Sequence, residues 1–359
     1  MKGSAIFITC NDLNQKYGGS LCTTRNYNWL SSRYKTYLYK ISKRSNFSSI
    51  KSVMLSTFPP VTTDDVENVI ELIKELHPIL IFFDGSYFGK MLCEIRKRIN
   101  LIYVITFFHN VEYDYINVRM RKTLKANVYR KLVSSSEQQM VNQSDMLICL
   151  TEADSCRIHS LYGKKANSLV PITLPDNCLP LDDKRVIDDS NYILMFGAYR
   201  RDTVLGVQWF LDCIYPYICR KVVVAGNGFE KFKVRRDNIV IRGKVEDLVY
   251  LYSEAACVVL PIIIGAGMKV KTCEALMYGR NIAGTDEAFV GYDRVDLNKI
   301  GIRYTTSGQL IEYINGLNGK ELFNKLSRQS YLEYYSESAA KRYFKNIFDS
   351  IDSSIGCVE

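Results

Sequence analysis

A short apolar segment, a loop with two glycines and a helix-permissive stretch follow one another between Ala255 and Gly279. Residues 255–261 are rich in alanine and valine, which is typical of a buried strand. Gly265 and Gly267 follow this segment and precede the helical stretch. A strand, a glycine loop and a helix in this order direct free backbone N–H groups and the positive end of the helix dipole towards one point. The pattern therefore favours a phosphate site at this loop.

Charged side chains in the same stretch extend this prediction. Lys269 and Lys271 place positive charge beside the loop, and Glu274 follows about one helical turn later. A carboxylate in that position can accept hydrogen bonds from the paired hydroxyls of a sugar. Together these residues predict a nucleotide or nucleotide-sugar site, although a glycine pair before a helix also serves as a simple tight turn.

A wider pattern surrounds this loop between Asn238 and Tyr292. It consists of Asn238-Ile239-Val240-Ile241-Arg242-Gly243, Asp247-Leu248, Tyr252, Ala255-Ala256, Leu260-Pro261, Gly265-x-Gly267-x-Lys269-x-Lys271-x-x-Glu274-Ala275, Gly279 and Gly284-Thr285. This pattern resembles the donor-binding half of GT-B glycosyltransferases, in particular the GT4-like group (glycosyl transferases group 1). Many members carry an acidic residue where this chain has Ala266. The chain is instead similar to the subgroup that has G-x-G-x-K-x-K-x-x-E-A.

The resemblance implies a donor site in the second half of the chain. The residues expected to bind the donor are Gly197, Arg200, Arg201, Gly226, Val245, Gly265, Gly267, Met268, Lys269, Val270 and Glu274. Within this set, either Arg200 or Arg201 is expected to reach the donor diphosphate, and the backbone at Val245 to pack against the nucleobase. Lys269, Lys271 and the loop amides would stabilise the leaving diphosphate, and Glu274 would hold the ribose hydroxyls. Lys271 and Glu274 are therefore also candidate catalytic residues.

The first half of the chain supplies a second set of candidates. Gly18 and Gly19 follow an apolar strand at 5–10, and His109 directly follows the apolar run 101–108. Ligands of open α/β sheets gather at the carboxyl ends of strands, so His109 is placed for a site. The resemblance to GT-B enzymes implies that Gly18 and Gly19 form a loop that approaches the acceptor or a donor phosphate, and a flexible connection is the alternative. A structural role for His109 at a strand end is the alternative. The sequence His-Asn-Val-Glu at 109–112 resembles a motif of the same group, which implies a catalytic His109 facing the transferred sugar and a site role for Glu112.

The length of 359 residues suggests about two domains. We expect an α/β protein of the GT-B class, with two Rossmann-like domains facing across a cleft and a C-terminal helix that crosses back to the first. The expected boundaries are an acceptor-side domain at 1–175, a proline- and aspartate-rich linker at 176–190, a nucleotide-sugar domain at 191–335 and the returning helix at 336–359.

Composition narrows the possible partners. The net charge of +9 suits an anionic small ligand, a nucleic acid or an anionic membrane surface. The eleven cysteines form no C-x-x-C pair and there are three histidines, so a zinc site or a disulfide framework is not expected. No signal peptide is visible, and the apolar runs are about half as long as a bilayer crossing requires. We expect a cytoplasmic protein, with peripheral contact to the inner face of the plasma membrane as an open alternative.

The resemblance implies a glycosyltransferase (a hexosyltransferase-type enzyme) that moves a sugar from a UDP- or GDP-sugar to a hydroxyl of a glycan or a lipid-linked acceptor. It further implies a retaining reaction without a bound metal or other cofactor, and a role in the synthesis of bacterial capsule or O-antigen. The alternatives are a nucleotide-sugar epimerase on the same fold and a non-catalytic binding protein. A nucleic-acid binder is suggested by charge alone, because no recognised module is present, and nucleic acid is not among the expected partners.

Overall fold

The computed structural model describes residues 3–14, 18–42, 61–99, 101–119, 123–178, 185–234, 236–265 and 267–356. The chain divides into two compact units, one of residues 1–171 with 341–359 and the other of residues 172–340. The expected linker at 176–190 lies outside the described residues at 179–184, and its described parts belong to the second unit. Residues 357–359 and Ala266 also lie outside the described residues.

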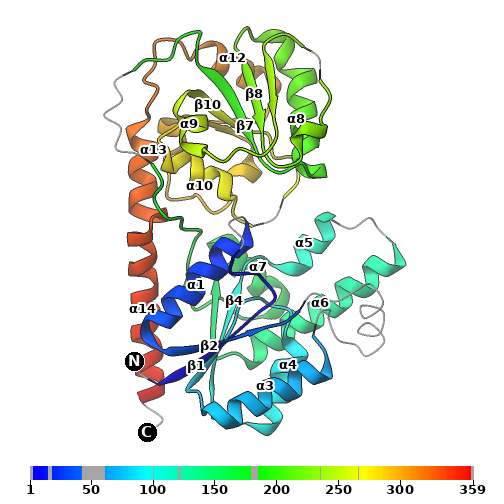
Figure 1. The fold of residues 1–359 in the computed structure, drawn as a ribbon. Coiled ribbons are helices and arrows are strands. Elements are labelled where there is room, and N and C mark those ends of the chain that lie inside the picture. Colours follow the sequence, from blue (N-terminus) through cyan, green and yellow to red (C-terminus); the bar gives the residue numbers. More distant parts are fainter. Residues whose placement is uncertain are drawn as a thin grey trace. The chain divides into compact units, whose positions relative to one another are not determined.

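The first unit is built on a parallel sheet of six strands with the order β2-β1-β3-β4-β5-β6 (Figure 1). Its central strands are continuous apolar runs buried on both faces, which is the pattern of a parallel sheet covered by helices. The strands are β1 (Ser4–Thr9), β2 (Lys35–Lys40), β3 (Leu80–Phe83), β4 (Tyr103–Phe108), β5 (Met146–Cys149) and β6 (Ser168–Leu169).

Helices α1 (Gly19–Arg33), α3 (Thr63–Leu76), α4 (Gly89–Arg98), α5 (Glu112–Arg119), α6 (Leu124–Gln143) and α7 (Glu152–Tyr162) belong to the same unit. The last helix, α14 (Glu337–Gly356), joins it from Lys341 onwards. Phe344 of α14 stacks on Trp29 of α1 with ring centroids 6.0 Å apart. Asp352 pairs with Arg33 and accepts a hydrogen bond from the Tyr34 hydroxyl. The C-terminal helix is therefore part of the first unit's core and not an appendage.

The second unit has its own parallel sheet of six strands, in the order β12-β11-β10-β7-β8-β9. The strands are β7 (Tyr192–Phe196), β8 (Val222–Ala225), β9 (Ile239–Arg242), β10 (Ala255–Leu260), β11 (Ile282–Gly284) and β12 (Gly301–Arg303). The helices are α8 (Arg201–Cys213), α9 (Leu248–Ser253), α10 (Val270–Met277), α11 (Leu297–Ile300), α12 (Ser307–Asn315) and α13 (Lys325–Ser330). Three short 3₁₀ turns (Tyr215–Tyr217, Phe229–Lys231 and Asp286–Phe289) and a π-helical turn at Tyr331–Tyr335 complete it.

Each sheet contains one point where the chain changes the direction in which it adds strands. In the first unit this point lies between β1 and β3, and in the second between β7 and β10. The loops at the carboxyl ends of two such strands diverge to opposite faces of the sheet and leave a crevice, where open α/β sheets bind ligands. The topology therefore directs attention to the segments that follow Thr9, Phe83, Phe196 and Leu260.

Within the described ranges, no helix combines the length and the hydrophobicity needed to cross a bilayer.

Candidate active site

The second unit brings Lys271 against Gly197. Gly197 follows β7 and Lys271 stands in the first turn of α10, so the two residues flank the crevice between β7 and β10. A Cβ atom at position 197 would collide with the Lys271 ammonium group, which therefore lies directly over the glycine backbone. A Cβ at Gly226, after β8, would in turn collide with the carbonyl of Gly197. Glycine is required at position 226, where a Cβ would meet backbone atoms, whereas at position 197 it would meet the flexible end of the Lys271 side chain.

Lys271 forms no hydrogen bond or ion pair within the described part of the chain. Burial lowers the pKa of this lysine to about 8, although the Asp202 and Glu274 carboxylates oppose the shift. A buried amine is costly to charge unless an anion accompanies it. The position is therefore suited to an incoming anion that restores the charge of Lys271.

Glu274 lies one turn further along α10. Its Oε2 atom accepts a hydrogen bond from the Tyr252 hydroxyl at 3.3 Å. The Tyr252 ring stacks on Tyr278, with centroids 4.6 Å apart, and so it is held firmly. Burial raises the pKa of Glu274 to about 7, against the influence of Tyr252 and Lys271. This carboxyl group retains acceptor capacity for the hydroxyls of a ligand.

Lys269 has a different environment from Lys271. Its Nζ atom lies 2.7 Å from Oε1 of Glu287 and also donates to the Gly267 carbonyl. The Tyr292 hydroxyl donates to the backbone carbonyl of Lys269 at 2.6 Å. Glu287 was not among the predicted site residues. The available signal was its place shortly after β11, at the same edge of the sheet as the glycine loop.

The glycine loop itself is shaped for close contact. A Cβ at Gly265 would lie 2.7 Å from Oε1 of Glu287, and Gly267 adopts a left-handed φ of 62°. Met268 is buried, and its sulfur accepts a hydrogen bond from the Ile172 amide at 3.4 Å. Val270 begins α10, whose first turn has no side-chain cap. The N–H groups there remain suited to an anion.

The remaining donor-side candidates lie further from Lys271 or point to solvent. Arg200 pairs with Asp202 at 2.9 Å at the start of α8. Arg201, the first residue of α8, is exposed and forms no hydrogen bond or ion pair with other described residues. Val245 is half-buried in the segment after β9. Gly197 therefore lies against both Lys271 and Gly226. Arg200, Arg201 and Val245 do not join this cluster.

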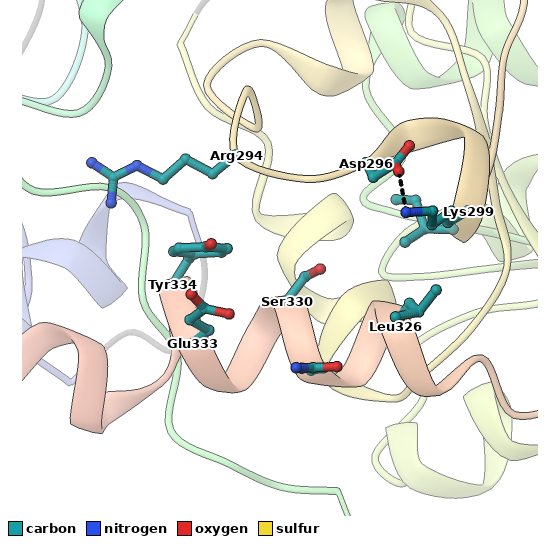
Figure 2. Close-up of a pocket in the computed structure, with 9 residues that line it drawn as sticks. Arg294, Asp296, Lys299, Leu326, Ser330, Glu333 and Tyr334 are labelled. Carbon is teal, nitrogen blue, oxygen red and sulfur yellow. Dashed lines mark ion pairs between the residues drawn. The ribbon is translucent and has the colours of Figure 1, made fainter.

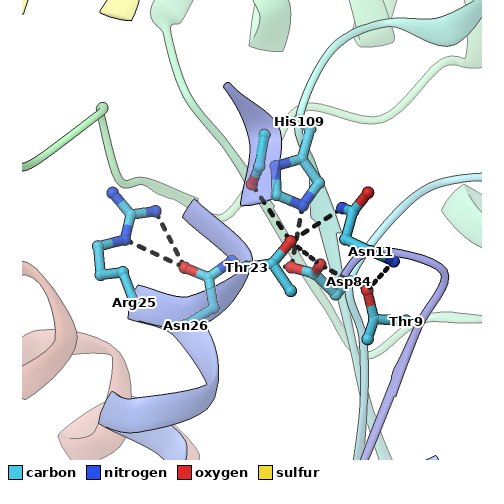
Figure 3. Close-up of polar contacts among 8 residues, drawn as sticks. Thr9, Asn11, Thr23, Arg25, Asn26, Asp84 and His109 are labelled. Atoms are coloured by element: carbon cyan, nitrogen blue, oxygen red, sulfur yellow. Dashed lines mark hydrogen bonds and ion pairs between the residues drawn. The ribbon is translucent and has the colours of Figure 1, made fainter. Parts of the chain in front are cut away.

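In the first unit, His109 meets an acid that the sequence interpretation did not select. Asp84 follows β3 and His109 follows β4, and the His109 Nε2 atom lies 2.9 Å from Oδ1 of Asp84 (Figure 3). Thr9, Thr23 and Asn26 donate further hydrogen bonds to the same carboxylate. Asp84 is fully buried. An acid immediately after an apolar strand, next to the strand that ends at His109, was the signal that could have identified it.

The other first-unit candidates are Gly18, Gly19 and Glu112, and none of them forms a side-chain contact with this pair that the structure records. Gly18 and Gly19 lie at the start of α1, are exposed, and have open space where a Cβ would stand. Glu112 begins α5, and its backbone N–H donates to the carboxylate of Glu137 at 2.9 Å. Glu137 is fully buried on α6 and also accepts from the Ser86 hydroxyl at 2.9 Å. Glu137 thus connects the loop after β3 with the loop after β4 and was not predicted.

The second unit also contains a pocket of about 190 Å³ away from the glycine loop (Figure 2). It is lined by residues of α11, α13 and the π-helical turn, among them Leu326, Ser330 and Tyr334. Its Asp296 and Lys299 pair with one another at 2.9 Å. None of the predicted site residues lines this pocket, and the chemistry of the glycine loop is therefore independent of it.

Within the residues that the structure covers, no cluster of three or more His, Cys, Asp or Glu side chains could hold a metal ion.

Comparisons with known proteins show that the second half of the chain is similar to glycosyltransferases. Residues 190–306 match the model of the family Glycosyl transferases group 1. This stretch contains the strand-glycine-helix arrangement and all of the predicted donor-side residues. The likeness to this family therefore lies within the second unit. A search of the curated proteins finds no match to the sequence.

Solved structures extend the likeness to the whole chain. Sucrose-phosphate synthase from Thermosynechococcus elongatus superimposes with a TM-score of 0.75 at 11% identity, covering 98% of this chain and 100% of that one. The apo form of the lipopolysaccharide outer core galactosyltransferase WaaB gives 0.68 at 12% identity, covering 98% and 99%. Anabaena HepE in complex with UDP-glucose gives 0.59 at 11% identity, covering 99% and 100%. The predicted fold class, α/β of the GT-B kind, is confirmed.

Proposed function

We propose that the chain is a glycosyltransferase that moves a sugar from a nucleotide-sugar donor to a hydroxyl group of a glycan or a lipid-linked acceptor. The observation that carries this proposal is Lys271, a half-buried cation whose side chain has no hydrogen-bond partner among the described residues, beside Gly197 and an uncapped helix start. Such a site supports the binding of a diphosphate. The match of residues 190–306 to a glycosyltransferase family supports the same function.

On the donor side, Lys271 and the amides of the glycine loop would bind the diphosphate, and Glu274 the ribose hydroxyls. The bond between the anomeric carbon and the diphosphate oxygen breaks, and its electron pair leaves with the nucleoside diphosphate. The acceptor hydroxyl oxygen forms the new bond, and its proton passes to the departing diphosphate. Lys271 stabilises the charge that develops on the leaving group, and one such donor contributes about 3 kcal/mol in other enzymes.

The finer features of the reaction belong to the same proposal. We expect a UDP- or GDP-sugar, a retaining reaction and no requirement for a metal ion or other cofactor. A place in bacterial capsule or O-antigen synthesis is supported by the likeness to a lipopolysaccharide galactosyltransferase. Peripheral contact of a cytoplasmic protein with an anionic membrane is supported by the net charge of +9.

The first experiment is a melting temperature of the purified protein with UDP, GDP and CMP in turn. A nucleotide at 100 times its Kd stabilises the folded state by about 2.7 kcal/mol, which is readily measured. We expect one nucleotide to raise the melting temperature of the wild type and to have no such effect on Glu274→Ala. No shift with any of the three at millimolar concentration would contradict a nucleotide site.

A second assay addresses turnover. The sugar form of the nucleotide that binds is incubated with the protein, with EDTA and with added magnesium, and nucleoside diphosphate release is followed. We expect release that EDTA does not diminish. Release that requires the added metal would overturn metal independence, and binding without any release would support the non-catalytic alternative. The anomeric configuration of a transferred sugar, read by proton NMR, decides between retention and inversion.

A further inference from the structure

The contacts of the Asp84–His109 pair indicate the protonation state of His109. Phe83 and Thr106 are register partners on the neighbouring parallel strands β3 and β4, so the residues that follow these strands meet at one sheet edge. Oδ2 of Asp84 accepts from the hydroxyls of Thr9 at 3.0 Å and Thr23 at 2.6 Å. Oδ1 accepts from the Asn26 amide at 3.0 Å and faces His109 Nε2 at 2.9 Å.

The protons in this network can be assigned from its neighbours. Both threonine oxygens already accept a hydrogen bond from Asn11, one from its backbone N–H and one from its side-chain amide, so both hydroxyls act as donors (Figure 3). The Thr23 hydroxyl lies 2.6 Å from Asp84 and 3.2 Å from the Gly19 carbonyl, so the shorter of its two contacts is to Asp84. The Arg25 guanidinium donates to Oδ1 of Asn26 at 2.9 Å, which leaves the NH₂ group of Asn26 facing Asp84. Every neighbour of Asp84 is thus a donor, and Nε2 of His109 carries a proton.

The charge of the pair follows from burial. Asp84 has no exposed surface, and among the described residues His109 is the one cationic side chain that pairs with it. A buried carboxylate without a counter-charge is strongly unfavourable, so the pair is most stable as a carboxylate with an imidazolium. Burial alone would lower the pKa of His109, but the Asp84 carboxylate raises it. Burial raises the pKa of the Asp84 carboxyl, but His109 lowers it below its ordinary value.

The other nitrogen of the ring has no oxygen or nitrogen partner among the described residues. Nδ1 of His109 is buried and forms no hydrogen bond within the described residues. The side chain is 10% exposed, and its ring packs against Phe107 with centroids 4.9 Å apart, so its orientation is held. The Cys22 thiol lies beside the ring and, like Asp84, raises the pKa of His109. The Arg25 guanidinium acts on this thiol, and the Tyr87 hydroxyl group faces Asp84. A buried N–H without an acceptor is unfavourable, and a bound oxygen atom that accepts from it would remove that cost.

We propose that Asp84 is a positioning residue that keeps His109 as a doubly protonated imidazolium, whose Nδ1–H donates a hydrogen bond to an oxygen atom of a ligand bound at this edge of the first unit's sheet. His109 then acts as a charged donor and not as a general base. The identity of the ligand oxygen rests on the proposed function, whereas the charge and the proton positions of His109 do not.

The test uses the full chain with nitrogen-15-labelled histidine and follows the NMR signals of the ring nitrogens from about pH 6 to about pH 9, the range in which an ordinary histidine loses its charge. The chain has three histidines, so the His109 signals can be assigned by comparison with His109→Gln. We expect both ring nitrogens of His109 to be protonated at neutral pH in the wild type. A neutral ring at that pH would overturn the proposal without any need for a variant.

The Asp84→Asn variant keeps the shape of the side chain but removes its charge. We expect its His109 ring to be neutral at neutral pH, with the signals of His77 and His159 unchanged as evidence that the unit is folded. Asp64→Asn removes an exposed carboxylate from α3 of the same unit and is the matched control, for which the His109 signals stay as in the wild type. An imidazolium that persists in Asp84→Asn would contradict the role of Asp84.

Turnover separates this inference from the proposed function. If a donor sugar is transferred, Asp84→Asn should lower kcat about 100-fold, the effect of losing one preorganised donor, while the KM for the donor changes little. A protonated His109 in a protein that turns over no nucleotide-sugar would refute the function and leave the charge assignment standing. Transfer by a protein whose His109 ring is neutral would refute the inference alone.

Discussion

Lys269 Nζ lies 2.7 Å from Oε1 of Glu287, whereas Nζ of Lys271, two residues further on, rests against the backbone of Gly197 and meets no acceptor among the described residues. The two lysines of one loop therefore have different electrostatic tasks. Lys269 is neutralised within the protein, and Lys271 is left for a ligand. Four predictions follow from this difference and from the packing around it.

The Lys271→Met substitution should remove nucleotide binding and yet stabilise the unliganded protein. The methionine fills the same space without the cost of a buried amine, whose pKa burial lowers to about 8. We expect the melting temperature to rise by about 2–4 °C, which corresponds to roughly 1 kcal/mol for a domain of this size. Lys299→Met, at a lysine whose side chain is 64% exposed, is the control and should still bind nucleotide. A destabilised Lys271→Met that still binds nucleotide would refute this account.

The Glu287→Gln substitution should strengthen nucleotide binding. Glu287 holds Lys269 in a pair whose side chains are 13% and 29% exposed, so an incoming diphosphate has to compete with a carboxylate for that lysine. Partly exposed pairs contribute up to about 1 kcal/mol, which corresponds to roughly fivefold in Kd. Isothermal titration with the nucleotide measures the change. Weaker binding in this variant would instead indicate that Glu287 itself contacts the ligand.

The Gly197→Ala substitution should impair both folding and binding. The added methyl group collides with the Lys271 ammonium, and overpacking of this kind costs about 1–3 kcal/mol. We expect a lower melting temperature and no stabilisation by nucleotide. The matched control is Gly308→Ala in α12, where a Cβ has open space and helix propensity makes the change neutral or favourable. Equal behaviour of the two variants would show that Lys271 moves aside freely.

Stability should pass through a shallow minimum between about pH 7 and pH 8. Burial raises the pKa of Glu274 from 4.5 to about 7, so between these values the folded state binds more protons and the free energy of unfolding falls as pH rises. Burial lowers the pKa of Lys271 from 10.5 to about 8, so between these values the unfolded state binds more protons and the free energy of unfolding rises with pH.

The comparison for this pH dependence is the double variant Glu274→Gln, Lys271→Met, measured by urea unfolding across the same range. The free energy of unfolding of the wild type, relative to that of the variant, should be lowest near pH 7–8, the range set by the two pKa values. A difference that does not vary with pH would show that neither group is perturbed by burial.

Local patterns in the sequence determined the order of strands and helices in both units. The central strands are short apolar runs that must be buried, and the glycine or polar residue that follows interrupts them, so β10, the loop and α10 could be located from the sequence pattern. The polar strand β2 and the short strands β6 and β12 do not have this pattern. The same reasoning placed His109 at the end of a strand and Lys271 at the start of a helix. The fold class follows from this alternation, because parallel strands require helical crossovers between them.

Only the tertiary structure decided which side chains meet. Asp84 is partnered by His109, Lys269 by Glu287 and the start of α5 by Glu137, and none of these contacts follows from residue spacing. They depend on which strands are neighbours and in which register, and these are set by the burial of many apolar side chains at once. Lys269 and Lys271 look equivalent in the sequence, but the backbone between them turns from loop into helix and directs one towards an acid and the other towards a glycine.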